Sequence, residues 1–410
     1  MIGVDIIRID RIEKLKKHKT FYAKFFTQNE YEYIEKKKFS NNTIAGLIAA
    51  KEAISKVFKT GIGAKLGLLD IEILHDKNVP YVNMNHDRIR KLATQKGVKN
   101  LDISISHDGD YAMATSVATE GFHIDIDEEM ISLLPKRKAN FNKYDYGKVL
   151  IIGGKKGMSG SIRLAATSAM KSGAGMVYIY TPKNVAESLS QTLIEPIIYS
   201  VDEDSDGQIA DLNTTEFIDL IQKMDAIAIG PGLGKPVIAG AMLKIILENF
   251  IGPVVIDADG LNVISGEMSL LKLKKNVYIT PHHMEFSRVS GKSLDEINSD
   301  REMVVTEFLK KYDINVLLKG NNSLVINRRR KYINQTGNSG MAKAGSGDSL
   351  TGILVALLAR KDNFDMLKLA TYIHGLCGDL AKIKLGEDSM TASDLVEQIP
   401  AVMKEMRNNE

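Results

Sequence analysis

The chain has 410 residues, of which 26% are charged and 44% apolar, and its formal net charge is +3. This length favours two domains of a globular protein. No run of 18 apolar residues and no basic-then-apolar leader occurs, so the sequence predicts neither a membrane span nor a secretory signal. The small charge excess argues against nucleic-acid binding, and the single cysteine, Cys377, fits a cytoplasmic protein without an internal disulfide.

Residues 1–118 have the pattern of a small α+β domain. We expect a short strand that places Asp5 at a sheet edge, then a basic helix through Leu15. The other expected elements are helices at 27–38 and 43–58, strands at 70–74 and 81–83, and a hairpin of strands 101–107 and 111–117. In the helix at 43–58, Glu52 and Lys56 stand four residues apart on a face away from the apolar stripe.

Four short motifs occur in this part, each once and in a fixed order. They are Gly3-Val4-Asp5, Ala49-Ala50-Lys51-Glu52-Ala53-Ile54-Ser55-Lys56, Thr60-Gly61-Ile62-Gly63 and Ser104-Ile105-Ser106-His107. With this order and length, residues 1–118 resemble holo-acyl-carrier-protein synthase. The resemblance implies a 4'-phosphopantetheinyl transferase-like domain that transfers 4'-phosphopantetheine from coenzyme A to a serine of acyl carrier protein.

The resemblance also implies roles for particular side chains. Asp5 and Glu52 match the Mg²⁺ carboxylates, Lys56 and His107 match residues beside the coenzyme A phosphates, and Arg11 matches the contact to the acidic carrier protein. Two carboxylates from separate elements suffice for Mg²⁺, which keeps its other positions for water and pyrophosphate. The structural alternatives are a salt bridge between Glu52 and Lys56 and a hairpin-edge histidine bonded to backbone.

One position departs from the synthase pattern. Leu47 stands where the family usually has arginine, so the cation behind one phosphate contact to coenzyme A is missing from this sequence. A different class of function is therefore kept open for residues 1–118, namely a non-catalytic oligomerisation module, in keeping with the trimeric habit of the family. We expect a homo-oligomer in either case.

Residues 119–147 form the expected connector and the beginning of the second part. They lack a strong period, carry an acidic run at 125–129 and then Pro135-Lys-Arg-Lys, and we place the domain boundary near 119–123. From Lys148 onward strands and helices alternate, which predicts a mostly parallel sheet covered on both faces. The expected strands begin at Lys148, Met176, Asp225, Pro253, Val277, Asn315 and Ser323.

The second part has polar or glycine-rich residues just after several of these strands. Gly230 to Gly234, Asp257 to Asn262, Thr280 to His283 and Lys319-Gly320 each follow a strand, and ligands bind at the carboxyl ends of strands in such sheets. Taken singly, each has an ordinary explanation as a turn, a helix cap or a structural histidine. Gly153-Gly154 lacks the further glycines of a dinucleotide-binding fingerprint.

A glycine-rich stretch, Asn338 to Gly352, precedes an apolar helical pattern that begins at Leu350. Backbone N–H groups of such a loop can turn toward one point at a helix N-terminus and form an anion hole. Asp348 lies at its edge, where a carboxylate can accept a proton from a hydroxyl that attacks phosphorus. The alternative is that Asp348 simply caps the helix.

A longer ordered set of motifs covers nearly all of residues 125–410. The set comprises Tyr146-Gly147-Lys148, Ser172-Gly-Ala-Gly-Met-Val, Ile229-Gly-Pro-Gly-Leu-Gly, Asp257-Ala-Asp-Gly-Leu-Asn, Thr280-Pro-His-His-Met-Glu-Phe, Leu318-Lys-Gly and Thr336-Gly-Asn-Ser-Gly-Met-Ala-Lys-Ala-Gly-Ser-Gly-Asp. It resembles the ADP- or ATP-dependent NAD(P)H-hydrate dehydratase family. The resemblance implies a ribokinase-like three-layer α/β domain at 148–410 that phosphorylates NAD(P)HX with ADP and, by loss of phosphate, restores NAD(P)H and leaves AMP.

In this resemblance Asp348 matches the catalytic base, and Gly347 matches a nucleotide contact. The nucleotide-binding loop corresponds to Lys319, Gly320, Asn321, Asn322 and Ser323, the anion-hole asparagine to Asn338, and the contacts to the damaged cofactor to Ser161, Gly232 and His282. The segment around Ser161 departs from the family pattern, as does Asn142-Lys143-Tyr144. A small-alcohol kinase of the same fold is the alternative activity, distinguished by a phosphorylated product.

Overall fold

The computed structural model describes residues 1–121, 126–137 and 140–408, which form two compact units, Met1–Asp125 and Ile126–Glu410. Residues 122 and 123 of the predicted boundary lie outside the described residues, as do residue 125 of the acidic run and Lys138. Within the described residues, no helix combines the length and the apolar character needed to cross a bilayer.

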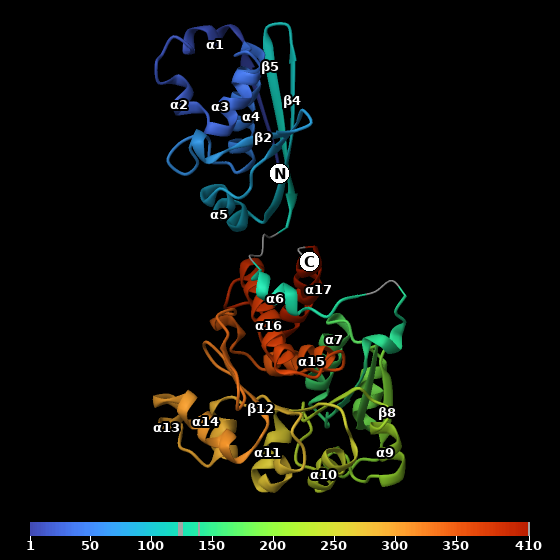
Figure 1. Ribbon diagram of the computed structural model, residues 1–410. Helices are drawn as coiled ribbons and strands as arrows, with labels where there is room; N and C mark the ends of the chain where they lie inside the picture. Colours follow the sequence, from blue (N-terminus) through green and yellow to red (C-terminus); the bar gives the residue numbers. More distant parts are fainter. Residues whose placement is uncertain (122–125, 138–139, 409–410) are drawn as a thin grey trace. The chain divides into compact units, whose positions relative to one another are not determined.

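The first unit is built on a three-stranded antiparallel sheet with strand order β1-β5-β4 and a long helix, α4 (Figure 1). Helices α2 and α5 were not predicted, whereas the predicted hairpin and the helix at 43–58 are confirmed. The elements are β1 (Ile2–Arg8), α1 (Asp10–Leu15), α2 (Phe21–Phe25), α3 (Gln28–Lys36), α4 (Asn41–Val57), η1 (Leu68–Asp70), β2 (Ile73–Asp76), β3 (Val79–Val82), α5 (Asp87–Lys96), β4 (Val98–Asp108) and β5 (Tyr111–Glu120).

Helix α4 packs on one face of this sheet at very short range. A Cβ atom on Gly3 of β1 would lie 2.0 Å from the carbonyl oxygen of Ala53, so β1 can cross α4 only with glycine at this position. Side chains on a strand alternate between faces, and Asp5 therefore lies on the same face as Gly3, next to α4. The opposite face is exposed and apolar, with Ile2, Val4, Ile6, Tyr111, Met113 and Val117 all at least 40% exposed.

A buried ion pair joins α3 to α4. Lys51 Nζ lies 2.6 Å from Glu30 Oε2, and neither side chain is exposed to solvent. Burial raises the pKa of Glu30 and lowers that of Lys51, and each partner's charge opposes the shift. Glu30 also accepts hydrogen bonds from the backbone N–H groups of Thr27 and Ile73, so one carboxylate connects three segments of the unit.

The second unit contains a nine-stranded, mostly parallel sheet, which confirms the predicted architecture. Its elements are α6 (Glu128–Leu133), η2 (Lys143–Tyr146), β6 (Lys148–Ile152), α7 (Ser159–Lys171), β7 (Met176–Pro182), α8 (Lys183–Ser190), β8 (Ile197–Val201), α9 (Thr214–Ile221), β9 (Ala226–Ile229), α10 (Ala239–Asn249), β10 (Val254–Ile256), α11 (Asp259–Gly266), η3 (Met268–Lys272), β11 (Val277–Ile279), α12 (His283–Ser290), α13 (Leu294–Ser299), α14 (Arg301–Lys311), β12 (Asn315–Leu318), β13 (Leu324–Ile326), β14 (Lys331–Ile333), η4 (Ser339–Met341), α15 (Ser346–Leu358), α16 (Phe364–Leu385) and α17 (Ala392–Asn408).

The sheet order is β14-β13-β12-β11-β10-β9-β6-β7-β8, and the strands from β12 to β8 are parallel. Figure 1 shows α7, α15, α16 and α17 on one face of the sheet and α9, α10 and α11 on the other. Strands β6, β9 and β10 are buried along their whole length except for the first residue of β6, as expected for strands covered on both faces. Their carboxyl ends therefore meet at one edge between the helical layers.

Replacing Lys51 with methionine leaves the Glu30 carboxylate buried without its cation, and breaking a buried pair in this way costs about 3 to 5 kcal/mol. We expect Lys51→Met to lower the free energy of unfolding of the first unit by roughly that amount. Native-state hydrogen exchange at the α4 amides of the full chain measures it. Lys59→Met, which changes an exposed lysine near the same helix, serves as the control, and a loss equal to that of the control would contradict the expectation.

Candidate functional site

The glycine loop, defined here as residues 337–348, leads into the first turn of α15. The helix begins at Ser346, earlier than the apolar pattern indicated, because its first turn is polar. The N-cap is Gly345 with φ +90°, where a Cβ atom would also lie 2.6 Å from Leu164 Cδ1. Asp348 is thus the third residue of the helix. The alternative prediction, that Asp348 caps the helix, is therefore wrong. Its carboxyl group is left available for other contacts at the helix N-terminus.

A partly buried charged network lies beneath this loop. Lys319, which follows β12, has its Nζ 2.8 Å from Asp257 Oδ1 at the end of β10, and Thr351 of α15 donates a hydrogen bond of 2.7 Å to Asp257 Oδ2. A Cβ atom on Gly347 would lie 3.1 Å from Lys319 Nζ, so the absence of a side chain there leaves the ammonium open to the loop. Three separate elements are joined by the single carboxylate of Asp257.

The network is charged at neutral pH. Burial by itself would raise the pKa of Asp257, but the attraction and hydrogen bond of Lys319 outweigh it and the pKa is lowered. For Lys319, burial favours the neutral amine, but the charges of Asp257 and Glu285 outweigh it and raise the pKa. The site therefore holds a fixed cation within reach of any anion bound by the glycine loop.

Asp348 has the protonation behaviour of a general base. Burial raises its pKa to about 6, with a further upward contribution from the nearby negative charge of Asp257, while a hydrogen bond from Ser161 and the charge of Lys319 oppose the shift. A base with a pKa close to the working pH is deprotonated at pH 7 and still accepts a proton readily. Perturbed carboxyl groups of this kind mark functional sites in general.

Ser161 and Gly232, predicted to contact the same ligand, come together at this edge. Ser161 is the third residue of α7, and its hydroxyl lies close enough to Asp348 to lower the pKa of that carboxyl group. Gly232, in the loop after β9, has φ +60°, and a Cβ atom there would lie 3.1 Å from Ser161 Cβ. Although the segment around Ser161 departs from the family pattern, the structure places its hydroxyl beside the predicted base. The cofactor contacts assigned to both residues stay predictions.

His282 and the predicted nucleotide loop lie at the ends of the neighbouring strands. The backbone of His282 pairs with that of Lys319. His282 Nδ1 accepts hydrogen bonds from the backbone N–H groups of Met284 and Glu285, so the ring caps α12 and carries its proton on Nε2. Burial, followed by the charge of Lys319, lowers the pKa of His282, and the ring is neutral at pH 7. Residues 320–322 are exposed, and Asn322 adopts φ +53°.

The sequence did not single out three of the residues that hold the site together. Thr351 and His374 of the C-terminal helices are buried. Each stands within an apolar stretch of the sequence, so no local motif marks it as a site residue. Ala258, directly after Asp257, has φ +48° and ψ −119°, a strained conformation for a residue with a Cβ atom. The strain lies between Asp257 and Asp259, two carboxylates whose charges both raise the pKa of Asp348.

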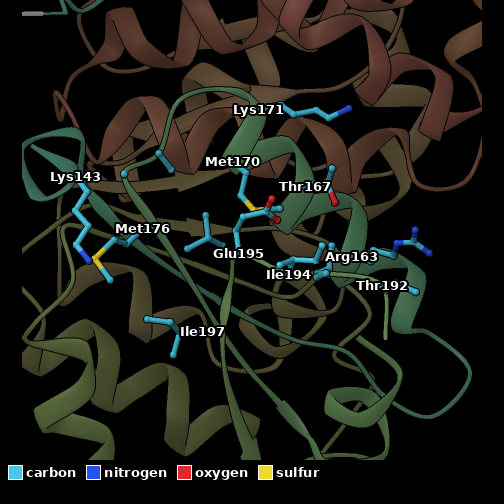
Figure 2. Close-up of a pocket in the computed structure, with 14 residues that line it drawn as sticks. Lys143, Arg163, Thr167, Met170, Lys171, Met176, Thr192, Ile194, Glu195 and Ile197 are labelled. Atoms are coloured by element: carbon cyan, nitrogen blue, oxygen red, sulfur yellow. The ribbon is translucent and has the colours of Figure 1, made fainter. Parts of the chain in front are cut away.

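A cavity of about 810 Å³ lies away from this edge, beside the C-terminal part of α7 and the beginning of β7 and β8. Figure 2 shows Lys143 on one side of this cavity and Arg163 on the other, with Met170 and Glu195 between them. In this view the side chains of Lys143, Arg163 and Lys171 do not converge on one point. None of the predicted site residues lines the cavity.

The first unit brings together three of its predicted site residues. Lys56 Nζ lies 2.8 Å from Asp5 Oδ1 and also donates to the carbonyl oxygen of Val4. Burial raises the pKa of Glu52, and the negative charge of Asp5 raises it further, which indicates that the two carboxylates share one site. In this structure Lys56 pairs with Asp5 rather than forming the helical salt bridge considered above.

His107 and Arg11 lie outside this cluster. His107 lies near the hairpin turn, where its backbone pairs with that of Ala112. Ile105, two residues earlier on the same strand, packs on α4: its Cγ2 lies 2.8 Å from the position that a Cβ atom on Gly46 would take. Both His107 and Arg11 are exposed. Leu47 is only 1% exposed and belongs to the core of the unit, so this position offers no surface for a phosphate contact here.

Comparison with protein families matches each unit separately. The family model described as NAD(P)H-hydrate dehydratase matches residues 149–401, and the model described as 4'-phosphopantetheinyl transferase superfamily matches residues 1–116. Among curated proteins, the bifunctional NAD(P)H-hydrate repair enzyme of Moorella thermoacetica is 34% identical over 278 residues, covering 67% of this chain and 52% of the relative. The corresponding enzyme of Escherichia coli is 31% identical over 278 residues, covering 67% and 51%. The chain thus spans about half the length of the curated relatives it matches.

Two solved structures resemble the second unit. The ADP/ATP-dependent NAD(P)H-hydrate dehydratase of Bacillus subtilis, co-crystallised with ATP and Mg²⁺, is 28% identical with a TM-score of 0.58 and covers 68% of this chain and 96% of that chain. A ribokinase-like protein of Enterococcus faecalis is 23% identical with a TM-score of 0.60, covering 70% and 99%. The predicted ribokinase-like fold is therefore confirmed.

Replacing Ser161 with alanine removes a hydrogen bond that lowers the pKa of Asp348, so the pKa rises above its value of about 6. Carboxyl ¹³C NMR titration of the full chain measures the change. Ser168→Ala on the same helix is the matched control, because the hydroxyl of Ser168 is buried without a hydrogen-bond partner in the described structure. An unchanged Asp348 titration in Ser161→Ala would show that the hydroxyl does not act on this carboxyl.

Proposed function

The chain belongs to the NAD(P)H-hydrate dehydratase family, and from this premise we propose that its second unit restores hydrated nicotinamide cofactors to NADH or NADPH with ADP as the phosphoryl donor. The observation that carries the proposal is Asp348, a half-buried carboxyl group with a pKa of about 6 at the end of the glycine loop and near the Lys319 ammonium. Phosphoryl transfer depends mainly on positioning and on stabilising charge, and this edge of the sheet offers groups for both.

In the proposed reaction, Asp348 accepts the proton of the ring hydroxyl as that oxygen forms a bond to the β-phosphorus of ADP. The phosphoanhydride bond breaks and AMP leaves. The first-turn N–H groups of α15 and the Lys319 ammonium face the negative charge that develops on the transferred group. Loss of phosphate from the ring carbon, with a proton from the adjacent carbon, then restores the double bond of the reduced nicotinamide.

We propose that the first unit is a holo-acyl-carrier-protein synthase that takes coenzyme A and acyl carrier protein as substrates. Support comes from the match of residues 1–116 to the transferase superfamily and from the adjacent carboxylates of Asp5 and Glu52. Within the described residues no cluster of three or more His, Cys, Asp or Glu side chains is arranged for a metal ion. Two carboxylates fit Mg²⁺ nonetheless, because this ion keeps several water or phosphate ligands.

In this proposal Asp5 and Glu52 would hold Mg²⁺, and the bound ion would supply positive charge to the pyrophosphate of coenzyme A. Lys56 leaves Asp5 and turns toward a phosphate, and the exposed Arg11 faces the acidic carrier protein. Because position 47 holds a buried leucine where the family usually has arginine, one cation is missing from the coenzyme A site, and binding of coenzyme A depends on fewer contacts. The exposed apolar face with Ile2, Ile6 and Met113 is our candidate for packing between copies in a homo-oligomer.

Asp348→Asn removes the proposed base, and we expect kcat for recovery of reduced cofactor from hydrated NADH to fall by about 10²- to 10⁴-fold. In the unaltered protein, kcat falls as the pH is lowered through about 6, because Asp348 becomes protonated. Absorbance of the returning NADH, with ADP and ATP tested separately, measures both effects. A stable phosphorylated product without reduced cofactor would identify a kinase instead.

Asp5→Asn and Glu52→Gln each remove one proposed magnesium ligand, and we expect both to reduce conversion of apo- to holo-acyl carrier protein by at least about tenfold. The mass increase of the carrier protein in the presence of coenzyme A and Mg²⁺ measures the conversion. Asp348→Asn is the matched control and converts at the normal rate. No conversion by the unaltered protein would favour the oligomerisation module.

A further inference from the structure

Helix α16 holds the glycine loop near both of its ends. Asp379 accepts hydrogen bonds from the backbone N–H of Gly337 at 2.9 Å and from Asn338 Nδ2 at 3.0 Å. His374, five residues earlier on the same helix, has its Nε2 2.9 Å from the carbonyl oxygen of Ser346. The loop is thus connected to α16 where it begins and where it enters α15.

The surface of α16 is shaped for this contact. A Cβ atom on Gly375 would lie 2.0 Å from Thr336 Oγ1, and one on Gly378 would lie 2.1 Å from Met341 Sδ. Both glycines lie in the interior of a helix, where glycine costs about 1 kcal/mol relative to alanine. The close approach they permit explains their presence and brings His374 within hydrogen-bonding distance of the loop.

The hydrogen bonds of His374 define its protonation state. The carbonyl oxygen of Ser346 can only accept, so the proton of the ring lies on Nε2. Burial lowers the pKa of His374 to about 4, and the ring is therefore neutral throughout the physiological range. Ser349 Oγ donates to the same carbonyl at 2.7 Å and lies 3.2 Å from His374 Nε2. One carbonyl group is therefore fixed by two donors.

The orientation of this carbonyl determines the direction of the next amide. The C=O of Ser346 and the N–H of Gly347 belong to one planar trans peptide unit and point in opposite directions. A donor that fixes the carbonyl on the α16 side therefore fixes the Gly347 N–H on the opposite side. Gly347 is the residue whose missing side chain leaves Lys319 open to the loop.

We propose that His374 is a positioning residue that fixes the peptide plane between Ser346 and Gly347 and thereby aims the Gly347 N–H at the phosphoryl group being transferred. The inference rests on the function proposed for the Asp348 site. His374 does not touch the substrate in this scheme, and it acts through the backbone of the loop. Loss of one well-aimed donor of this kind costs about 10²- to 10³-fold in kcat in other enzymes.

The test compares His374→Leu, His374→Gln and Thr371→Val in the full chain. Leucine removes the donor, glutamine keeps an N–H near the position of Nε2, and Thr371→Val removes a buried hydroxyl of α16 that donates to the carbonyl oxygen of Leu367 in its own helix. We expect His374→Leu to lower kcat about 10- to 100-fold with a change in the KM for ADP of less than about threefold. Glutamine recovers most of kcat, and Thr371→Val leaves it unchanged.

Three results would overturn the proposal: an unchanged kcat in His374→Leu, equal losses in the leucine and glutamine variants, or a comparable loss in Thr371→Val. Hydrogen exchange of the peptide covering residues 337–350 provides a readout that needs no turnover. Exchange should accelerate in His374→Leu and stay unchanged in Thr371→Val. If the unaltered protein fails to process hydrated NADH, the proposed function fails, while this exchange experiment still decides whether His374 holds the loop.

Discussion

The partly buried ion pair between Lys319 and Asp257 is the interaction on which the candidate site of the second unit depends. It joins the ends of β10 and β12, and Thr351 extends it to α15 through Asp257 Oδ2. A carboxylate as buried as that of Asp257 is stable only when its hydrogen bonds are satisfied, and here they are made by groups from different elements. The position of the cation and the position of the helix that carries Asp348 are consequently fixed together.

This arrangement also gives two carboxylates in one site different protonation behaviour. Asp257 is paired with Lys319 and has a lowered pKa, whereas Asp348 is half-buried and has a raised pKa. Environment rather than residue type thus gives the two carboxyl groups opposite pKa shifts. The first unit likewise combines a carboxylate that is paired with a cation, Asp5 beside Lys56, with a carboxyl group, Glu52, whose pKa is raised.

In both units, glycine residues allow two elements to approach each other closely. Gly3 allows β1 to cross α4, and Gly375 allows α16 to contact the segment before the glycine loop. In each case the adjacent polar side chain gains its partner because the backbones are close. The first unit thereby places Asp5 beside Lys56, and the second places His374 beside the carbonyl of Ser346.

The sequence by itself determined the alternation of strands and helices after Lys148 and the motifs at the strand ends, because these depend on local periodicity and on residue type. It also indicated Asp348 as the residue at the edge of an anion hole. It did not reveal His374, Thr351 or the pairing of Lys319 with Asp257, since these contacts join residues at least 25 positions apart and no local pattern encodes them. Only the tertiary structure decided which polar residues meet, because the parallel sheet and the helices packed on it bring distant segments to one edge.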